Sequence, residues 1–136
     1  MGMTESEQIA ELLKNAKTIA VVGLSDNPAR VSYDVSQYMQ SQGYRIIPVN
    51  PAIAESLGEK AYPTLSEVPG KIDIVNVFRR SEHVPEAVEE AIALKVPAIW
   101  MQEGVEHEAA AEKARAAGIF VVMDRCILKE HRRWVR

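Results

Sequence analysis

Thr18-Ile-Ala-Val-Val-Gly-Leu-Ser-Asp-Asn-Pro-Ala-Arg30 is the stretch of sequence that decides the fold. Residues 18–22 are mostly β-branched, a pattern typical of a strand buried on both faces of a sheet. Gly23 ends the run, and small and polar residues lead to a helical pattern that starts near Ser32. The first N–H groups of a helix are unpaired, and its dipole adds about half a positive charge. With the charge of Arg30 added, we expect a phosphate to bind here.

The bulk composition is that of an ordinary globular domain. The chain has 136 residues, 47% of them hydrophobic and 26% charged, which predicts a single domain. The net charge of −3 gives no electrostatic reason to expect nucleic acid or an anionic membrane as partner. No apolar run approaches the ~20 residues that span a bilayer. Cys126 is the only cysteine, which excludes an internal disulfide and a thiolate metal cluster, and the cytoplasm is the expected location.

Outward from the opening stretch, short apolar runs alternate with helical patterns. Strands are expected at 18–22, 44–49, 72–78, 97–101 and 119–123, and helices at 5–15, from near 32 to Gly43, at 84–94 and at 106–117. Residues 52–63 look irregular, 64–67 suggest a short capped turn, and the charged tail from 128 is expected to be helical, with Trp134 as its large apolar anchor. Residues 1–3 look like an expression scar before a start at Met3, so the domain is expected over 4–136.

Alternating strands and helices predict βαβ units, and therefore a parallel sheet covered by helices on both faces. The leading architecture is an α/β, Rossmann-like, doubly wound parallel sheet of five strands in one domain. In such sheets ligands bind beyond the carboxyl ends of the strands. This rule selects the loops at 23–30, 50–52, 78–82, 102–105 and 124–126.

The opening loop differs from the nicotinamide dinucleotide fingerprint. That fingerprint needs Gly-x-Gly-x-x-Gly and an acidic residue about 20 positions later. Ser25 and Pro28 stand at the second and third glycine positions, and the neutral Asn50 ends the second strand. Both differences argue against NAD as the ligand. Ser25 and Asn27 can still hydrogen-bond a phosphate, and Arg30 can form a bidentate pair with it. Arg79-Arg80 at the same edge favours a multiply charged anion.

Five motifs then resemble one family along most of the chain. They are Val-Val-Gly-Leu-Ser-Asp-Asn-Pro-Ala-Arg (21–30), Pro-Val-Asn-Pro (48–51), Asp-Ile-Val-Asn-Val-Phe-Arg-Arg-Ser-Glu (73–82), Trp-Met-Gln-Glu-Gly-Val (100–105) and Val-Val-Met-Asp-Arg-Cys (121–126). The motifs occur in the same order and register as in the small bacterial CoA-binding-domain proteins, which the chain resembles from Ile9 to about Arg132. The implied fold is that of the N-terminal CoA-binding domain of the succinyl-CoA synthetase alpha subunit.

The resemblance implies coenzyme A as the ligand and a set of binding residues around it. Those implied at the phosphates are Gly23, Leu24, Ser25 and Arg30, and the hydrogen-bonding capacity of Asn27 adds it to the expected set. Asn50 and Pro51 are expected beside the adenosine, flanked by Val77, Phe78 and Arg79, and Gln102 and Gly104 beside the pantetheine. Two interpretations of Phe78 stay open: its ring stacks on the adenine, or it packs in the hydrophobic core.

The chain departs from the family pattern at two positions. Val31 replaces the proline usual after the arginine, and Ala52 stands where a lysine often follows Asn-Pro. Either the 3′-phosphate then lacks a partner, or Lys60 reaches it. The synthetase's phosphohistidine belongs to a further domain, so the resemblance does not imply ligase chemistry.

Three hypotheses about the function stay open on the sequence. The leading one is non-covalent binding of CoA or a short acyl-CoA without chemistry. The second is an NAD-type or acyl-CoA-processing enzyme that uses Cys126, for which the candidate bases are His83, His107 and His131. The third is a regulatory module that reports the bound ligand to a protein partner. The three histidines are too dispersed to indicate a metal site.

Overall fold

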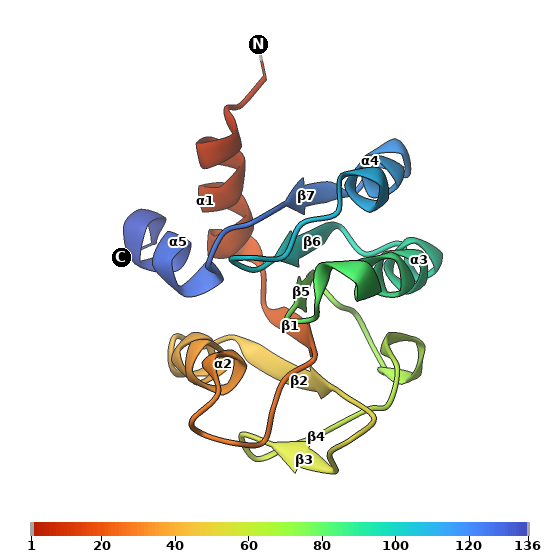
Figure 1. Cartoon of the computed structure of the whole chain (residues 1–136). Helices are drawn as coiled ribbons and strands as arrows, with labels where there is room; N and C mark the ends of the chain where they lie inside the picture. The colour runs from red at the N-terminus through yellow and green to blue at the C-terminus, as the bar shows by residue number, and fades with distance from the viewer. Residues whose placement is uncertain (1, 136) are drawn as a thin grey trace.

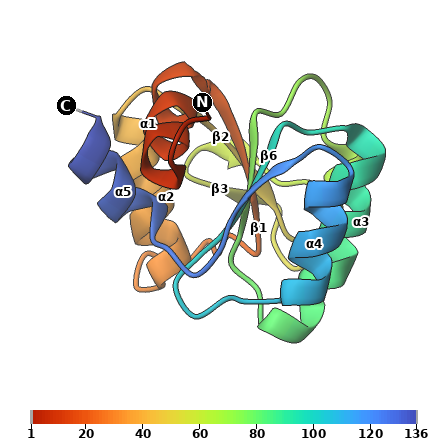
Figure 2. The same ribbon diagram turned by 90° about the horizontal axis from the view of Figure 1, so that it is seen from above.

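The computed structural model describes residues 2–135 as a five-stranded parallel sheet between two layers of helices (Figures 1 and 2). The predicted scar includes Met1, which lies outside the described residues, as does Arg136. The strands of the sheet are β1 (Thr18–Val22), β2 (Arg45–Val49), β5 (Ile74–Val77), β6 (Ala98–Met101) and β7 (Phe120–Val122). The helices are α1 (Glu5–Asn15), α2 (Val31–Ser41), α3 (Val84–Leu94), α4 (Glu108–Ala116) and α5 (Ile127–Trp134). The predicted α/β class and five-stranded sheet are confirmed.

Each strand of the sheet serves two separate cores. Ile19 and Val21 belong to the core under α1, α2 and α5, whereas Ala20 and Val22 belong to the core under α3 and α4. Figure 2 shows these two groups of helices on opposite sides of the sheet. Side chains alternate between the faces of a strand, so a strand buried on both faces needs an unbroken apolar run. Trp100 in β6 is fully buried.

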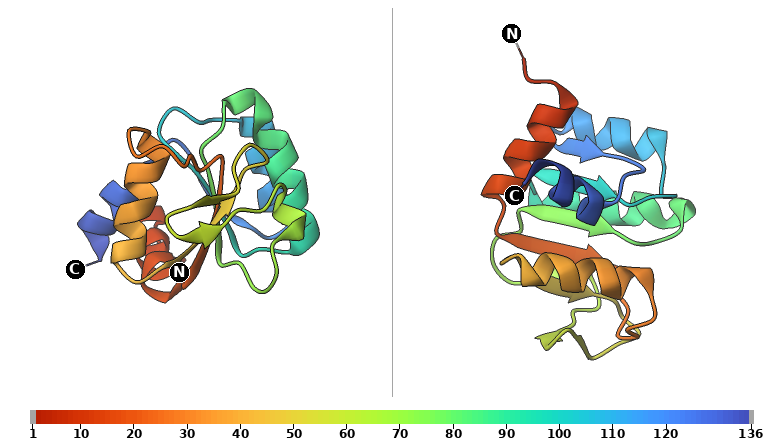
Figure 3. Two further views of the ribbon diagram at one scale, coloured as in Figure 1. Left: turned by 90° about the horizontal axis from the view of Figure 1, so that it is seen from below. Right: turned by 90° about the vertical axis from the view of Figure 1, so that its left-hand side faces the viewer.

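The sheet changes direction next to β1. The strand order is β2-β1-β5-β6-β7, so the chain moves from β1 outward to β2 and then returns to the other side of β1. All pairings are parallel, and the strands point the same way in Figure 3. Val22, the last residue of β1, pairs with Val49 of β2 and with Val77 of β5. Gly23 therefore leaves the sheet at the switch point, where doubly wound sheets bind their ligands.

Helix boundaries follow local capping. The Thr4–Glu7 capping box is present at the start of α1. The predicted start of a helix at Glu106 was wrong, because the His107 side chain accepts the N–H of Ala110 and caps α4 there. The tail helix, α5, begins at Ile127, which is fully buried and anchors it, so Trp134 is not its principal anchor. Within residues 2–135, no helix is long and apolar enough to cross a membrane.

Residues 52–63 contain a small hairpin that the sequence pattern did not predict. It is formed by β3 (Glu55–Ser56) and β4 (Glu59–Lys60), and two 3-10 turns, η1 (Leu65–Glu67) and η2 (Ser81–His83), follow it. Leu57 and Gly58 both have positive φ, 55° and 77°, as in the turns that join two-residue hairpins. The Ser56 hydroxyl donates to the Ser25 carbonyl at 2.8 Å. The hairpin therefore supports the loop between β1 and α2.

Candidate functional site

A cavity of about 570 Å³ lies at the switch point, beyond the end of β1. It brings together five of the residues expected at a ligand site, namely Gly23, Ser25, Arg30, Asn50 and Phe78. The remaining lining residues are Ala29, Val31 and Ser32, which were not among the expected site residues. Phe78 is half-buried, because it both packs on the core under α2 and forms part of the cavity wall.

Only glycine fits at position 23. Its φ is +91°, and a Cβ built on it would collide with the carbonyl oxygen of Phe78 and lie 3.0 Å from the Cδ of Arg79. Its N–H donates to the Val49 carbonyl at 2.8 Å, while the Phe78 N–H donates to the Val22 carbonyl at 2.8 Å. The turn thus joins the ends of three strands through backbone contacts. Because the Gly23 N–H is already paired, Gly23 offers a ligand close approach rather than a hydrogen bond.

The N-terminus of α2 faces this cavity with unpaired donors. Arg30 is the N-cap residue, in extended conformation, and its side chain caps no N–H group. The Asp34 N–H is the first to bond back, to the Arg30 carbonyl at 3.1 Å. Within residues 2–135, the N–H groups of Val31, Ser32 and Tyr33 have no acceptor. Three open N–H groups, the helix dipole and the exposed Arg30 guanidinium together favour an anion.

Side chains of the loop itself hold it in shape. The buried Ser32 hydroxyl accepts the Ser25 N–H at 3.1 Å, and the Ser25 hydroxyl accepts the Asn27 N–H at 3.0 Å. The Asn27 side-chain carbonyl accepts the Ala29 N–H at 3.0 Å. These are the local turns that Ser and Asn favour. Asn27, expected at the phosphates, does not line the cavity and serves to fold the loop. Ser25 and Ser32 keep hydroxyl protons that can be donated to a ligand.

Asn50 fastens the end of β2 to the end of β1. Its Nδ2 donates to the Leu24 carbonyl at 3.0 Å, and its Oδ1 accepts the Ala52 N–H at 2.9 Å. The Leu24 side chain is fully buried. Within residues 2–135, the Leu24 N–H has no acceptor, so this backbone group is what Leu24 can offer a ligand. Asn50 therefore holds the ends of β1 and β2 together. It is neutral, whereas the dinucleotide fingerprint has an acidic residue at the end of the second strand.

A second cavity, of about 320 Å³, lies at the same carboxyl edge of the sheet, where Val22 and Val49 end their strands. Its lining includes Pro51 and Arg79, together with Val22, Val49, Pro63, Thr64, His83, Glu86, Ala87 and Glu90. The Arg79 side chain passes close to Gly23, which lines the first cavity. Arg80 is exposed and lies 3.9 Å from Glu82, so the two adjacent arginines have different surroundings. Val77 is fully buried in the core under α3 and lines neither cavity.

Gln102 and Gly104 lie at the same edge of the sheet but apart from both cavities. The buried Gln102 side chain accepts the Ile127 N–H at 3.0 Å, at the start of α5. The Gly104 N–H donates to the Asp124 carboxylate at 2.7 Å. These bonds fasten the loop after β6 to the loop after β7. The two residues expected beside the pantetheine thus hold neighbouring loops together and line neither cavity.

Cys126 and the histidines have separate surroundings. Cys126 is buried as the N-cap residue of α5. His131 is buried, and its Nδ1 lies 2.8 Å from the Tyr38 hydroxyl; burial lowers the pKa of its imidazole. His107 caps α4, and His83 lies 4.0 Å from Glu82. No hydrogen bond of the described chain joins Cys126 to a histidine, and within it no three His, Cys, Asp or Glu side chains are placed to hold a metal ion.

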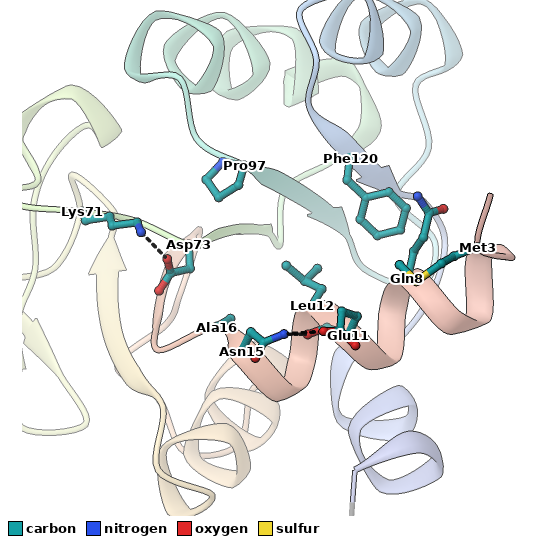
Figure 4. A pocket seen from close by; sticks show the side chains of 10 residues that line it. All are labelled: Met3, Gln8, Glu11, Leu12, Asn15, Ala16, Lys71, Asp73, Pro97 and Phe120. Atoms are coloured by element: carbon teal, nitrogen blue, oxygen red, sulfur yellow. Dashed lines mark hydrogen bonds and ion pairs between the residues drawn. The ribbon is translucent and has the colours of Figure 1, made fainter. Parts of the chain in front are cut away.

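A further cavity, of about 420 Å³, lies at the opposite, amino end of the sheet (Figure 4). Leu12, Pro97 and Phe120 supply apolar walls. Four of its polar side chains pair with one another: Asn15 donates to the Glu11 side chain at 2.9 Å, and Lys71 lies 3.9 Å from Asp73. The Asp73 carboxylate also accepts the Lys17 and Thr18 N–H groups. The carboxylates of Glu11 and Asp73 therefore make this cavity less favourable for an anion than the carboxyl edge.

Known proteins resemble this chain over most of its length. A family described as CoA binding domain matches residues 17–132. The uncharacterized protein YneT of Bacillus subtilis is 51% identical over 124 residues, which cover 91% of this chain and 92% of YneT. A solved structure of a hypothetical protein from Pyrococcus horikoshii OT3 superposes with a TM-score of 0.94 at 38% identity, covering 99% of this chain and 94% of that one.

A longer relative shares only one part of its length with this chain. The alpha subunit of the ADP-forming acetate–CoA ligase II of Pyrococcus furiosus is 38% identical over 61 residues. These residues are 44% of this chain but 13% of the ligase subunit. The shared segment therefore represents a small portion of that enzyme.

Proposed function

This chain belongs to the CoA-binding domain family, and from that premise we propose that it binds coenzyme A, or a short acyl-CoA, without covalent chemistry. The observation that supports this proposal most strongly is the cavity at the switch point. There, the open N–H groups of α2 and the Arg30 guanidinium face the same space as Ser25 and Ser32. Such a set of donors suits a pyrophosphate, whose oxygens accept several hydrogen bonds at once.

In this proposal the adenosine half extends from the pyrophosphate past Asn50 toward the second cavity. Pro51 and Arg79 line that cavity, and Phe78, which lines the first cavity, directly precedes Arg79 in the chain. Lys60 is the cation that we assign to the 3′-phosphate in place of a lysine at position 52. Its Nζ lies 5.2 Å from the centre of the Tyr62 ring, and Tyr62 is bridged to Val49 at the end of β2.

The pantetheine arm then runs the other way along the carboxyl edge, past Gln102 and Gly104 toward Cys126. All three residues follow strands that end at this edge. Since Cys126 is buried and has no histidine base bonded to it in the described chain, we assign it no chemical role. A domain that holds CoA and returns it unchanged serves as a carrier or as a sensor of CoA supply.

Calorimetric titration of the purified chain with CoA, dephospho-CoA and NAD tests the ligand. We expect CoA to bind more tightly than dephospho-CoA, because Lys60 meets the 3′-phosphate, and NAD to bind most weakly. Tighter binding of NAD than of CoA would contradict the proposal.

The absence of chemistry is tested separately. Acetyl-CoA incubated with the chain should be recovered intact by chromatography, and Cys126→Ala should behave identically. Consumption of the thioester by the wild type but not by this variant would establish an enzyme instead.

A further inference from the structure

Val31 is an exposed apolar residue that lines the cavity at the switch point, next to polar residues. It is the first residue of α2, and 68% of its surface is exposed. Single exposed apolar residues are common and need no explanation by themselves. Val31, however, lines the cavity together with its sequence neighbours Arg30 and Ser32. Ala29 and Phe78 add further apolar side chains to the same lining. An apolar strip therefore borders the group of donors that suits a phosphate.

The backbone of Val31 adds to this arrangement. The first position of a helix favours proline, which has no N–H. With valine in that place, the N–H is retained, and it has no acceptor within residues 2–135. A ligand at this point would therefore meet one extra donor and, directly beside it, a branched aliphatic side chain.

The ligand that fits is one whose phosphate is joined, through a single CH₂ group, to a branched aliphatic carbon. In CoA, the pyrophosphate is attached to a CH₂ group and then to a carbon with two methyl groups. In NAD and ADP-ribose, a hydroxyl-bearing ribose takes that place. We propose that Val31 is a specificity-determining residue: its N–H binds the pyrophosphate and its side chain contacts the dimethyl carbon of the pantoyl group. This inference rests on the proposed function.

The matched ligands are dephospho-CoA and ADP-ribose, which share the ADP half and differ in the group attached to the far phosphate. Calorimetry gives the ratio of their Kd values for the wild type and three variants. Val31→Thr keeps the shape and the N–H but replaces a methyl by a hydroxyl, so the preference for dephospho-CoA should fall about fourfold. Leu94→Thr, at an exposed apolar residue outside this cavity, is the control and should leave the ratio unchanged.

Val31→Pro removes the N–H and keeps an apolar side chain. Proline is tolerated at a helix start, and Arg30, at φ −85° and ψ 145°, already has the conformation that a residue before proline requires. Both Kd values should rise about tenfold, the loss expected for one hydrogen bond to a charged group. Circular dichroism of each variant checks that α2 is retained.

The outcomes separate the two proposals. If Val31→Thr keeps the wild-type ratio, or if Val31→Pro leaves both Kd values unchanged, the role of Val31 is refuted while CoA binding stands. If the wild type binds neither ligand, the proposed function itself fails, and the inference fails with it.

Discussion

Gly23→Ala is the substitution whose effect the structure defines most closely. The φ of +91° disfavours any residue with a Cβ, and the added Cβ would collide with the Phe78 carbonyl and lie 3.0 Å from its carbon. Gly43 provides the matched control, because its φ is +99° but nothing lies within 4 Å of an added Cβ. The pair therefore separates backbone strain from collision.

The magnitudes are set by these contacts. Positive φ alone costs about 1 kcal/mol for alanine, which is the full effect expected for Gly43→Ala. At Gly23, the clash is relieved only if the end of β1 moves away from β5. That movement weakens the Phe78–Val22 and Gly23–Val49 backbone bonds, both 2.8 Å long and each worth about 1 kcal/mol. Gly23→Ala should therefore lower the free energy of unfolding by about 3 kcal/mol.

Urea denaturation followed by circular dichroism measures both values in one buffer. A total stability of about 5–15 kcal/mol is usual for such a domain, so a loss of ~3 kcal/mol is readily resolved. CoA affinity should also fall in Gly23→Ala, because the displaced turn carries the cavity wall, and stay at the wild-type value in Gly43→Ala. If the two variants lose the same stability within about 0.5 kcal/mol, the close approach of Gly23 to β5 is refuted.

Three other predictions concern single side chains. Arg30→Ala should weaken CoA binding by about 1–3 kcal/mol in calorimetry, whereas Arg115→Ala, at an exposed ion pair on α4, should leave it unchanged; equal affinities for both would place Arg30 outside the site. Burial lowers the pKa of His131 in the folded state, so the unfolded chain binds more protons below about pH 6.5 and the free energy of unfolding falls as the pH drops through that range. In urea melts His131→Gln should reduce this slope, and an unchanged slope would contradict its assignment. Asn76→Val removes a buried side-chain oxygen that has no partner within residues 2–135, so its urea midpoint should equal or exceed that of the wild type, and a clear decrease would refute this.

The architecture was predictable because each strand carries its signal locally. The run from Thr18 to Val22 is apolar at nearly every position, as burial on both faces demands, and glycine comes next, where the chain must turn sharply. The β3–β4 hairpin was not predictable from such a pattern. Its two-residue strands are too short to show alternation, and Leu57 takes a positive φ that leucine rarely adopts. Tertiary contacts explain its place: Ser56 bonds to the β1–α2 loop, and the Leu57 carbonyl accepts from Gln40 of α2.

The candidate site was predictable in part, for a related reason. Strand-end loops meet at one edge in any parallel sheet, so Gly23, Ser25, Asn50 and Phe78 could be grouped from their positions alone. Which side chains face the ligand depends on hydrogen bonds within the loops, and these are not visible in the sequence. Ser32 was missed for this reason, although a serine hydroxyl at a helix start can accept a loop N–H, as it does from Ser25, and still donate to a ligand.

The most direct test of the central claim is a map of backbone amide NMR shifts during titration with CoA. The claim is that the open N–H groups at the start of α2 bind the pyrophosphate. We expect the largest shifts on Leu24, Val31, Ser32 and Tyr33, and we expect inorganic pyrophosphate to move the same resonances at higher concentration. Shifts centred instead on the amino-end cavity around Leu12 and Phe120 would contradict the claim.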